Sequence, residues 1–264
     1  VMPDGVKRAF SFATAPGAGP TIELQIRRVA GGRYTTHVFE EMKVGDTVDF
    51  EGPLGSFFLR EDSSKPIVFV AGATGFAPVK SMVEHAFATG LKRRMVLYWG
   101  TRTPRDMYAR ELCEQWAKDH PATFKFVPVI SEATPEDGWT GRTGLVHEAI
   151  LADFPTLAGH QVYACGSVAM VEAAHPAFRA RGMDPNDCFS DAFRLTPHLA
   201  RTTPAEEVVK LGRALFRGER APRGEHRVRP QLRRAGGVAQ CGRGALRHAG
   251  GGLHAQQLLR LGRG

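Results

Sequence analysis

The sequence predicts an α/β fold in which a parallel-sheet domain over residues 65–193 follows a partial antiparallel β-barrel over residues 1–62. Short apolar runs separated by Gly and Pro fill the first segment, whereas fully apolar strands alternate with helical patterns in the second. Residues 195–264 differ from both, because they hold thirteen Arg and a single aromatic residue. For these residues we expect a disordered basic tail.

The first segment has the spacing of short antiparallel strands. Runs typical of strands cover residues 9–13, 21–29 and 46–51, with Gly- or Pro-rich stretches between them. Strands of this length are typical of a small barrel or sandwich. Three of them are too few to close a barrel, so we expect only part of one.

The second segment opens with a strand over residues 67–71 that is apolar on both faces, as in the centre of a parallel sheet. Residues 72–75 turn the chain, Pro78 stands in the first turn of a helix, and Gly90 ends that helix. The same alternation then recurs. It predicts strands over residues 95–99, 124–130 and 161–165 and helices over residues 105–118, 144–153 and 169–181, the last interrupted by Pro176.

Neither a membrane span nor a metal site is indicated. No run of about eighteen apolar residues is present, and the first residues lack the pattern of a signal peptide, so we expect a cytoplasmic protein without a membrane partner. The cysteines have neither the spacing of a zinc site nor that of an iron–sulfur cluster. They are Cys113, Cys165, Cys188 and Cys241.

The basic charge belongs to the tail. With thirteen Arg, one Lys and four Glu, residues 195–264 carry +10, whereas the whole chain carries +8, so residues 1–194 carry −2. Such a tail either binds nucleic acid through phosphate contacts or has no selected function. We favour the second interpretation, because no RNA-binding motif interrupts the tail, and we allow for one short helix around residues 204–216.

The turn over residues 72–78 stands where open parallel sheets bind phosphate, at the carboxyl end of a strand and the start of a helix. It is not the common GxGxxG pattern, so a plain tight turn is the alternative interpretation.

Four motifs in a fixed order favour the binding interpretation, because together they resemble the ferredoxin-NADP-reductase superfamily. Arg8-Ala9-Phe10-Ser11 matches its flavin motif R-x-[YF]-[ST], and Gly32-Arg33-Tyr34-Thr35 resembles its second flavin motif. Residues 72–78 resemble its G-x-T-G-x-x-P nicotinamide loop, and Tyr163-Ala164-Cys165-Gly166 resembles its Cys-Gly motif. The surrounding sequence is most similar to CDP-6-deoxy-Δ3,4-glucoseen reductases and related NAD(P)H-flavin reductases.

The resemblance implies an FAD site in the first segment. Arg8 would pair with the flavin pyrophosphate, Phe10 would stack on the isoalloxazine, and Ser11 would hydrogen-bond near N5, the atom that accepts hydride. The family places backbone along the flavin edge and backbone N–H groups against phosphate. The matching positions are Ile26 and Arg27 for the first contact and Gly32, Tyr34 and Thr35 for the second.

The resemblance also implies a nicotinamide site in the second segment. Gly72, Thr74 and Gly75 would let the nicotinamide approach the backbone closely. Ala73 departs from the family, which has Gly at this position, and its methyl group conflicts with a positive φ.

Three further residues are implied at later strand ends. Cys165, followed by Gly166, would lie beside the nicotinamide C4 and help to position the hydride. Phe193 resembles the aromatic residue that shields the flavin. For Cys165 and Phe193, a purely structural place in the core is the alternative interpretation.

The preference for NADH over NADPH is inferred from charge. Ser131 is followed by Glu132, at the position where the family often has Arg when NADPH is the donor. A carboxylate repels a 2′-phosphate and accepts hydrogen bonds from a free ribose diol. An exposed Glu132 without any ligand contact is the alternative.

These implications predict a flavin-dependent oxidoreductase that passes hydride from NADH to FAD and electrons on to an iron–sulfur protein or a free flavin. The alternatives are an inactive nucleotide-binding fragment and a nucleic-acid-binding protein that acts through its tail. The inactive fragment stays open because the chain starts almost at the first flavin motif, whereas the family has several strands before it.

Overall fold

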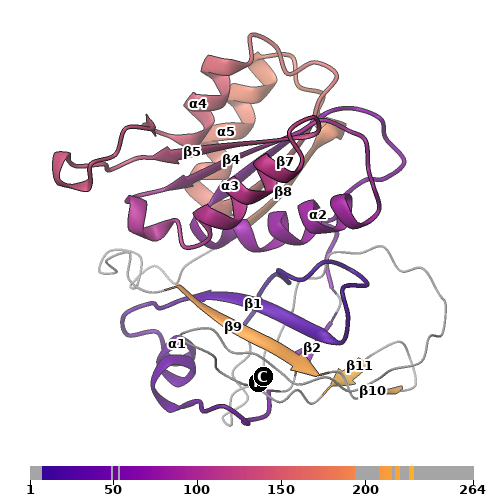
Figure 1. The fold of residues 1–264 in the computed structure, drawn as a ribbon, viewed down its shortest axis with the longest axis vertical. Coiled ribbons are helices and arrows are strands. Elements are labelled where there is room, and N and C mark those ends of the chain that lie inside the picture. The colour runs from indigo at the N-terminus through magenta and orange to yellow at the C-terminus, as the bar shows by residue number, and fades with distance from the viewer. Residues whose placement is uncertain are drawn as a thin grey trace. The chain divides into compact units, whose positions relative to one another are not determined.

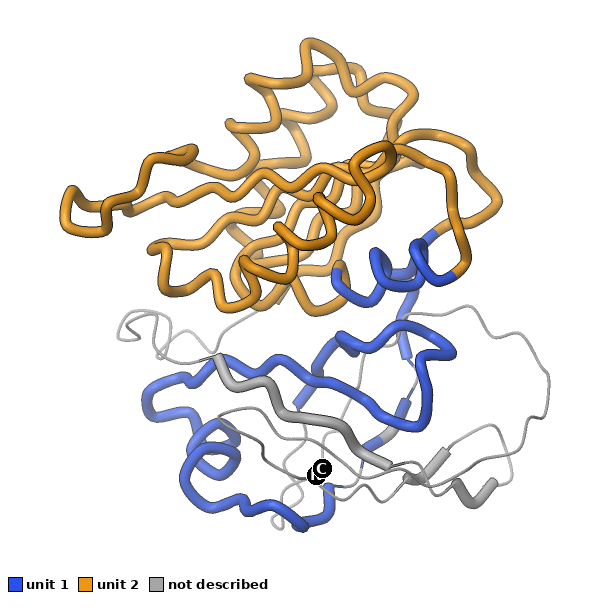
Figure 2. The backbone as a smooth tube through the Cα atoms, viewed as in Figure 1, with its two compact units in different colours: residues 1–59, 80–88, 197–264 blue, residues 60–79, 89–196 orange. Residues whose placement is uncertain are grey.

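The structure, a computed structural model, describes residues 8–48, 50–52, 54–193, 208–215, 218–220 and 226–228. The chain divides into two compact units, which Figure 2 colours separately. Unit 1 comprises residues 1–59, 80–88 and 197–264, and unit 2 comprises residues 60–79 and 89–196. The sequence predicts the first domain to end at residue 62, three residues beyond the end of the first stretch of unit 1.

Unit 2 contains a six-stranded sheet in which all neighbouring strands are parallel (Figure 1). The strand order is β6-β5-β4-β3-β7-β8. The strands are β3 (Ile67–Gly72), β4 (Met95–Thr101), β5 (Phe124–Ile130), β6 (Arg142–Thr143), β7 (Gln161–Ser167) and β8 (Cys188–Phe193). The predicted parallel α/β fold is confirmed, with β6 and β8 as additional strands at the two edges.

Helices cover both faces of this sheet. They are α2 (Phe76–Ala88), α3 (Arg110–Asp119), α4 (Val146–Asp153) and α5 (Val168–Ala180). Val68 and Val70 of β3, together with Tyr98 of β4, belong to a core cluster completed by α4 and α5. Trp99 faces the other way, because successive side chains of a strand alternate, and it stacks on Phe76 at a centroid distance of 4.1 Å.

Two helices differ in detail from the sequence-based expectation. α5 is not interrupted at Pro176 but continues to Ala180, and Pro176 is exposed, so its ring meets solvent rather than the core. The second part of α2, residues 80–88, belongs to unit 1. There Lys80 Nζ donates a hydrogen bond to Ala13 O at 3.1 Å. The sequence pattern alone assigns the whole helix to the second domain, because it cannot show this tertiary contact.

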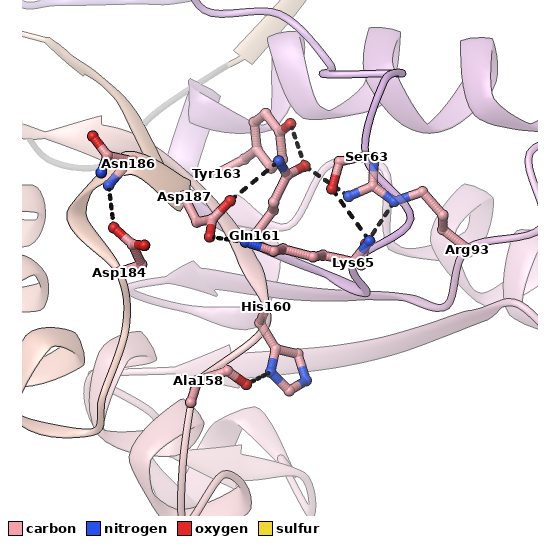
Figure 3. A network of polar contacts seen from close by, with 10 residues as sticks. All are labelled: Ser63, Lys65, Arg93, Ala158, His160, Gln161, Tyr163, Asp184, Asn186 and Asp187. Carbon is pink, nitrogen blue, oxygen red and sulfur yellow. Dashed lines mark hydrogen bonds and ion pairs between the residues drawn. The ribbon is translucent and has the colours of Figure 1, made fainter.

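A buried arginine organises the amino ends of the strands, at the edge of the sheet where β3 and β7 begin (Figure 3). Arg93 Nε donates to Lys65 O at 2.6 Å, and its two terminal nitrogens donate to Arg60 O and to Gln161 Oε1, each at 2.7 Å. Lys65 also forms an ion pair with Asp187. These contacts fasten the segment before β3 to the starts of β7 and β8.

Unit 1 is built from short elements. They are β1 (Thr21–Arg27), α1 (Arg33–Thr36), a π-helical turn (His37–Glu41), β2 (Phe50–Glu51), β9 (Val208–Leu215), β10 (Gly218–Arg220) and β11 (His226–Val228). β1 agrees with the predicted strand over residues 21–29. In place of the strand predicted over residues 9–13, Ser11 and Phe12 form isolated bridges, that of Phe12 with Leu24. The helical turns over residues 33–41 are not predicted, because the flanking Gly31-Gly32 pair indicates only a turn.

Part of the predicted tail is extended in the structure. β9 pairs antiparallel with β1, and β10, β11 and β2 form a three-stranded sheet. A strand therefore occupies most of the stretch where we allow for a helix, and it covers an edge of β1 whose backbone groups need partners. The other residues of the tail lie outside the described residues, so the prediction of disorder for them stays a prediction.

Candidate functional site

The chain reverses its direction across the sheet at β3. From β3 it proceeds through β4 and β5 to one edge, and then returns to place β7 on the other side of β3. In open parallel sheets, such a switch point opens a crevice at the carboxyl ends of the two strands, where ligands bind. The predicted nicotinamide-site residues of unit 2 stand at this carboxyl edge of the sheet: Gly72, Thr74, Gly75, Ser131, Glu132, Cys165 and Gly166. Phe193, which is predicted to shield the flavin, ends β8 at the same edge.

Glycines build the edge on both sides of the switch point. A Cβ on Gly75 would lie 2.0 Å from Cys165 O and 2.9 Å from Gly166 N, so the loop after β3 touches the backbone of β7. A Cβ on Gly72 or on Gly166 would meet the side chain of Met170 at 2.7 Å. Gly75 therefore excludes a Cβ, because backbone atoms stand in its way, whereas at Gly72 and Gly166 the flexible end of Met170 could move aside. The bare backbone at these three positions fits the close approach of a dinucleotide.

The turn between β3 and α2 is strained at one residue. Ala73 has a φ of +48° and is the only residue other than glycine with a positive φ in the described part of the chain. This conformation costs a residue with a Cβ roughly 1–2 kcal/mol. Trp99 Nε1 donates to Ala73 O at 3.0 Å and so holds the turn, in which Thr74 is half-buried. The conflict expected at Ala73 is therefore present in the structure.

Replacing Ala73 by glycine is expected to raise the free energy of unfolding by about 1 kcal/mol, because glycine adopts a positive φ without strain. Urea denaturation measures the change. Ala77→Gly is the matched control, since Ala77 lies in α2 without a positive φ and should lose about 1 kcal/mol. A decrease in stability for both variants would contradict the strain at Ala73.

Cys165 is completely buried at the end of β7. Burial raises the pKa of its thiol well above the usual range, and the carboxylate of Asp191 on β8 raises that pKa further. The thiol is therefore protonated at neutral pH. A neutral, buried thiol can pack and orient a ligand through its neighbours, but it is no nucleophile. Gly166, the next residue, is buried as well.

Stability is expected to fall at alkaline pH. Burial raises the pKa of Cys188 to about 11 and also raises that of Cys165. A raised pKa means that the folded state holds its proton more tightly than the unfolded state. This contribution is complete below the unfolded thiol pKa, near 8.5, and is lost as the pH rises toward the folded values. Urea denaturation between pH 8 and pH 11 should show the decline, and Cys188→Ser should make it shallower; an identical decline would contradict this origin.

Glu132, which follows β5, forms an ion pair with Arg102. Both of its carboxylate oxygens accept hydrogen bonds from Arg102, and Arg102 lowers the pKa of Glu132. The positive charge of Arg102 therefore balances the negative charge of Glu132. The sequence alone predicts that an unpaired Glu132 repels a 2′-phosphate, and the ion pair weakens that repulsion. The hydroxyl of the exposed Ser131 donates to Thr101 O at 3.4 Å.

The start of α5 and the end of β8 complete this edge. Ser167 Oγ accepts the N–H of Met170 at 3.2 Å and caps the helix. Phe193, the last residue of β8, lies opposite Ser167 in the sheet and is half-buried. Its predicted contact with a flavin stays a prediction.

In unit 1, the first flavin motif contains a buried hydroxyl without a partner among the described residues. Ser11 Oγ is buried and forms no hydrogen bond with any described residue. A buried hydroxyl without a partner is costly, so this atom fits a ligand that supplies one. Phe10 packs on Tyr34 at a centroid distance of 5.3 Å. Arg8 is exposed, and its charge opposes the rise that burial causes in the pKa of Tyr34.

The second flavin motif forms the start of α1. The N–H of Gly32 already donates to Val29 O at 2.9 Å, so this residue does not offer the phosphate donor that the resemblance implies. The hydroxyl of Thr35 lies 3.0 Å from the carbonyl oxygens of both Val29 and Gly32 and secures the turn. The N–H groups of Tyr34 and Thr35 precede the first helical bond, which runs from Thr36 N–H to Gly32 O.

The predicted flavin-edge residues lie at the end of β1. The side chain of Ile26 is buried in the core of unit 1, and Arg27 is half-buried. In the pairing with β9, Ile26 stands opposite Val209 and Arg27 opposite Val208.

Three residues of the carboxyl edge are absent from the sequence-based site. Trp99 secures Ala73, Met170 covers Gly72 and Gly166, and Arg102 pairs with Glu132. The sequence could have indicated Arg102, because it comes shortly after the predicted strand over residues 95–99 and so lies at the carboxyl edge of the sheet. Nothing in the sequence indicates the other two, since their contacts depend on how the strands pair.

Two family models match the chain in succession. An oxidoreductase FAD-binding domain covers residues 2–59, and an oxidoreductase NAD-binding domain covers residues 69–176. No helix in the part of the chain that the structure describes is both long and apolar enough to cross a bilayer.

Several similar proteins are reductases that serve a dehydrase or an oxygenase. The chain is 45% identical over 190 residues to the CDP-6-deoxy-L-threo-D-glycero-4-hexulose-3-dehydrase reductase of Yersinia pestis, covering 72% of this chain and 56% of that protein. It is 35% identical over 198 residues to reductase component 2 of the terephthalate 1,2-dioxygenase of Comamonas sp., covering 74% and 57%. The crystal structure of the Amycolatopsis cytochrome P450 reductase GcoB matches with a TM-score of 0.65 and 35% identity, covering 73% and 58%. The chain thus spans little more than half the length of these relatives.

Proposed function

The chain belongs to the ferredoxin-NADP-reductase-like oxidoreductases, which combine an FAD-binding with an NAD-binding domain, and we propose that it is the flavoprotein reductase of an electron-transfer system. Bound FAD would take hydride from NADH and release electrons one or two at a time. The acceptor in this proposal is an iron–sulfur protein or a free flavin, and the location is the cytoplasm. The similarity to reductases of a dehydrase and a dioxygenase supports a protein acceptor.

The observation that carries the proposal is the buried hydroxyl of Ser11, for which the described residues supply no partner. In this proposal the Ser11 hydroxyl donates a hydrogen bond to the flavin ring, and Arg8 neutralises the flavin pyrophosphate. The N–H groups of Tyr34 and Thr35 face phosphate. Each of these residues binds or orients the cofactor, and none exchanges a proton with the substrate.

The carboxyl edge of unit 2 takes the nicotinamide dinucleotide in this proposal. Gly72, Gly75 and Gly166 bring the end of β3, the turn after it and the end of β7 close together, and this bare backbone at the edge is the feature that supports its binding there. Cys165 contributes a neutral thiol below the surface of the edge.

Purified protein mixed with FAD should retain a flavin absorption spectrum after gel filtration and lose its colour anaerobically when NADH is added. Ser11→Ala is expected to weaken flavin binding roughly tenfold, because it removes one hydrogen bond to the ring. Ser64→Ala, at an exposed position of unit 2, is the matched control and should leave flavin binding unchanged.

Failure to retain flavin would contradict the proposal. Binding of NADH without bleaching of added flavin would instead support an inactive nucleotide-binding protein. The strained Ala73 supports this second candidate, because strain in the turn after β3 can misplace the nicotinamide without removing the other contacts of the dinucleotide.

A further inference from the structure

The ammonium group of Lys80 is buried in unit 1, to which α2 contributes residues 80–88. Its Nζ donates to Ala13 O at 3.1 Å and lies 3.2 Å from Glu23 Oε2. Both carboxylate oxygens of Glu84, one helical turn later, lie 2.9 Å from it. A buried charge is costly unless such partners replace the water that it loses. The side chain of Lys80 is therefore held in place by the groups around it.

The next residue of α2 makes a similar contact. Ser81 Oγ donates to Thr14 O at 2.7 Å, and Ser81 is buried as well. Two consecutive residues of the helix therefore hold two consecutive carbonyl groups, those of Ala13 and Thr14. A helix is stiff, so it fixes this stretch of backbone more firmly than a loop would.

β1 holds the same stretch as well. Ala13 N–H donates to Glu23 O at 2.8 Å, and Glu23 N–H donates to Thr14 Oγ1 at 2.6 Å. Because the carboxylate of Glu23 also pairs with Lys80, the contacts among Lys80, Ala13 and Glu23 close into a ring. A shift of any one of these residues therefore strains its contacts with the other two.

This ring follows the first flavin motif in the chain. Ser11, the last residue of that motif, precedes Ala13 by two residues, and Phe12 between them bridges to Leu24 of β1. Consecutive Cα atoms are about 3.8 Å apart, so a displacement of Ala13 is passed to Ser11 over a very short distance. The buried Ser11 hydroxyl forms no hydrogen bond with any described residue, so its position depends on the backbone that carries it.

We propose that Lys80 is a positioning residue for the flavin. It holds the chain immediately after the first flavin motif and thereby keeps the Ser11 hydroxyl where the flavin ring accepts its hydrogen bond. Lys80 acts through the backbone in this role, without touching the cofactor or transferring a proton. In the sequence it follows the nicotinamide loop, so only the tertiary contacts connect it with flavin binding. The inference rests on the proposed function, because it presupposes that FAD binds at Ser11.

The first test measures the dissociation constant of FAD by the quenching of flavin fluorescence. Lys80→Met keeps an unbranched side chain of similar length but loses the donor to Ala13 O. It also removes the cation that Glu23 and Glu84 share. The dissociation constant should rise roughly tenfold, as for the loss of one hydrogen bond. Lys80→Arg keeps a cation with N–H donors, so its constant should stay within about threefold of the parent value.

A double variant shows whether Lys80 acts through Ser11. Ser11→Ala alone is expected to weaken flavin binding roughly tenfold. Independent effects would multiply, so Ser11→Ala with Lys80→Met would then bind FAD roughly a hundredfold more weakly than the parent. If Lys80 positions the Ser11 hydroxyl, the double variant should stay near the roughly tenfold loss of either single variant, because the positioned hydroxyl is already gone.

Val83→Ala is the control for general destabilisation. Val83 is completely buried in the same part of α2, and its truncation leaves a cavity that lowers stability. It should weaken FAD binding by less than about threefold, and its effect should multiply with that of Ser11→Ala. At saturating FAD, the visible circular dichroism of the flavin should match the parent spectrum in Val83→Ala and differ from it in Lys80→Met.

Hydrogen exchange provides a measurement without flavin. In the protein free of FAD, the backbone amides of residues 10–14 should exchange roughly tenfold faster in Lys80→Met, because this stretch loses a contact worth about one hydrogen bond. The strands β3 and β4 of unit 2 serve as the internal reference and should exchange at the parent rate.

Parent-like FAD binding in Lys80→Met, an equal loss in Val83→Ala, or a roughly hundredfold loss in the double variant would overturn the inference and leave the proposed function intact. Unchanged exchange of residues 10–14 would overturn it as well. If the parent protein itself did not bind FAD, the proposed function would be contradicted, and the role of Lys80 in flavin binding with it.

Discussion

Replacing Gly75 by alanine is expected to abolish measurable dinucleotide binding and to lower the free energy of unfolding by about 3 kcal/mol. The added Cβ would lie 2.0 Å from Cys165 O and 2.5 Å from Cys165 C, and both are backbone atoms at the end of a buried strand. No rotation of a side chain relieves such a contact. The turn after β3 or the end of β7 must move, and both form the proposed binding edge. Urea denaturation and calorimetric titration with NADH measure the two effects.

Gly90→Ala is the matched control for this variant. Gly90 has a φ of +68°, but a Cβ there would meet nothing within 4 Å. Its substitution should therefore cost only the backbone strain, about 1 kcal/mol, and leave dinucleotide binding unchanged. If Gly75→Ala lost no more stability than Gly90→Ala and still bound NADH, the close approach of the two strand ends would be refuted.

Replacing Arg93 by methionine should lower the free energy of unfolding by about 3 kcal/mol. The carbonyl oxygens of Lys65 and Arg60 lose the donor that Arg93 supplies, and the side-chain oxygen of Gln161 keeps only its hydrogen bond from the Tyr163 hydroxyl at 3.1 Å. Arg93 is buried, so water does not readily replace it, and each unsatisfied acceptor costs roughly 1–3 kcal/mol. The midpoint of urea denaturation should fall accordingly, without a change in its slope.

The neighbouring residue offers the control, because Arg94 is exposed. Arg94→Met should change the free energy of unfolding by less than about 0.5 kcal/mol. Arg93→Lys should fall between the two variants, since lysine keeps the charge but lacks the planar fork that reaches three acceptors. Similar losses for Arg93→Met and Arg94→Met would show that the network contributes nothing beyond surface charge.

The regular part of the fold could be predicted because its signals are local. The apolar run over residues 67–71 and the spacing of Val79, Met82 and Val83 depend only on neighbours in the sequence. β8 lacks such a signal, because Asp191 and Ser190 interrupt its apolar residues at an edge of the sheet. The short helical turns near Tyr34 lack it as well.

The residues of the candidate site were predictable where a motif names them, but their contacts were not. The loop containing Gly75 matches a family pattern, yet only strand pairing shows that Gly75 touches Cys165. Glu132 draws notice by its position, whereas its pairing with Arg102 joins residues 30 positions apart in the chain. Ala73 needed both the sequence and the structure. The family pattern, which has Gly at this position, predicts a conflict, and the backbone shows it as a positive φ.

The network around Arg93 and the glycines of the carboxyl edge occupy opposite ends of the same strands. Five residues of β3, Ile67 to Ala71, separate them, which corresponds to roughly 16 Å at the rise of an extended strand. Substitutions that far apart usually change folding free energy independently. Stabilising substitutions at the amino edge can therefore compensate for destabilising ones that change coenzyme preference at the carboxyl edge. The same compensation is open to evolution.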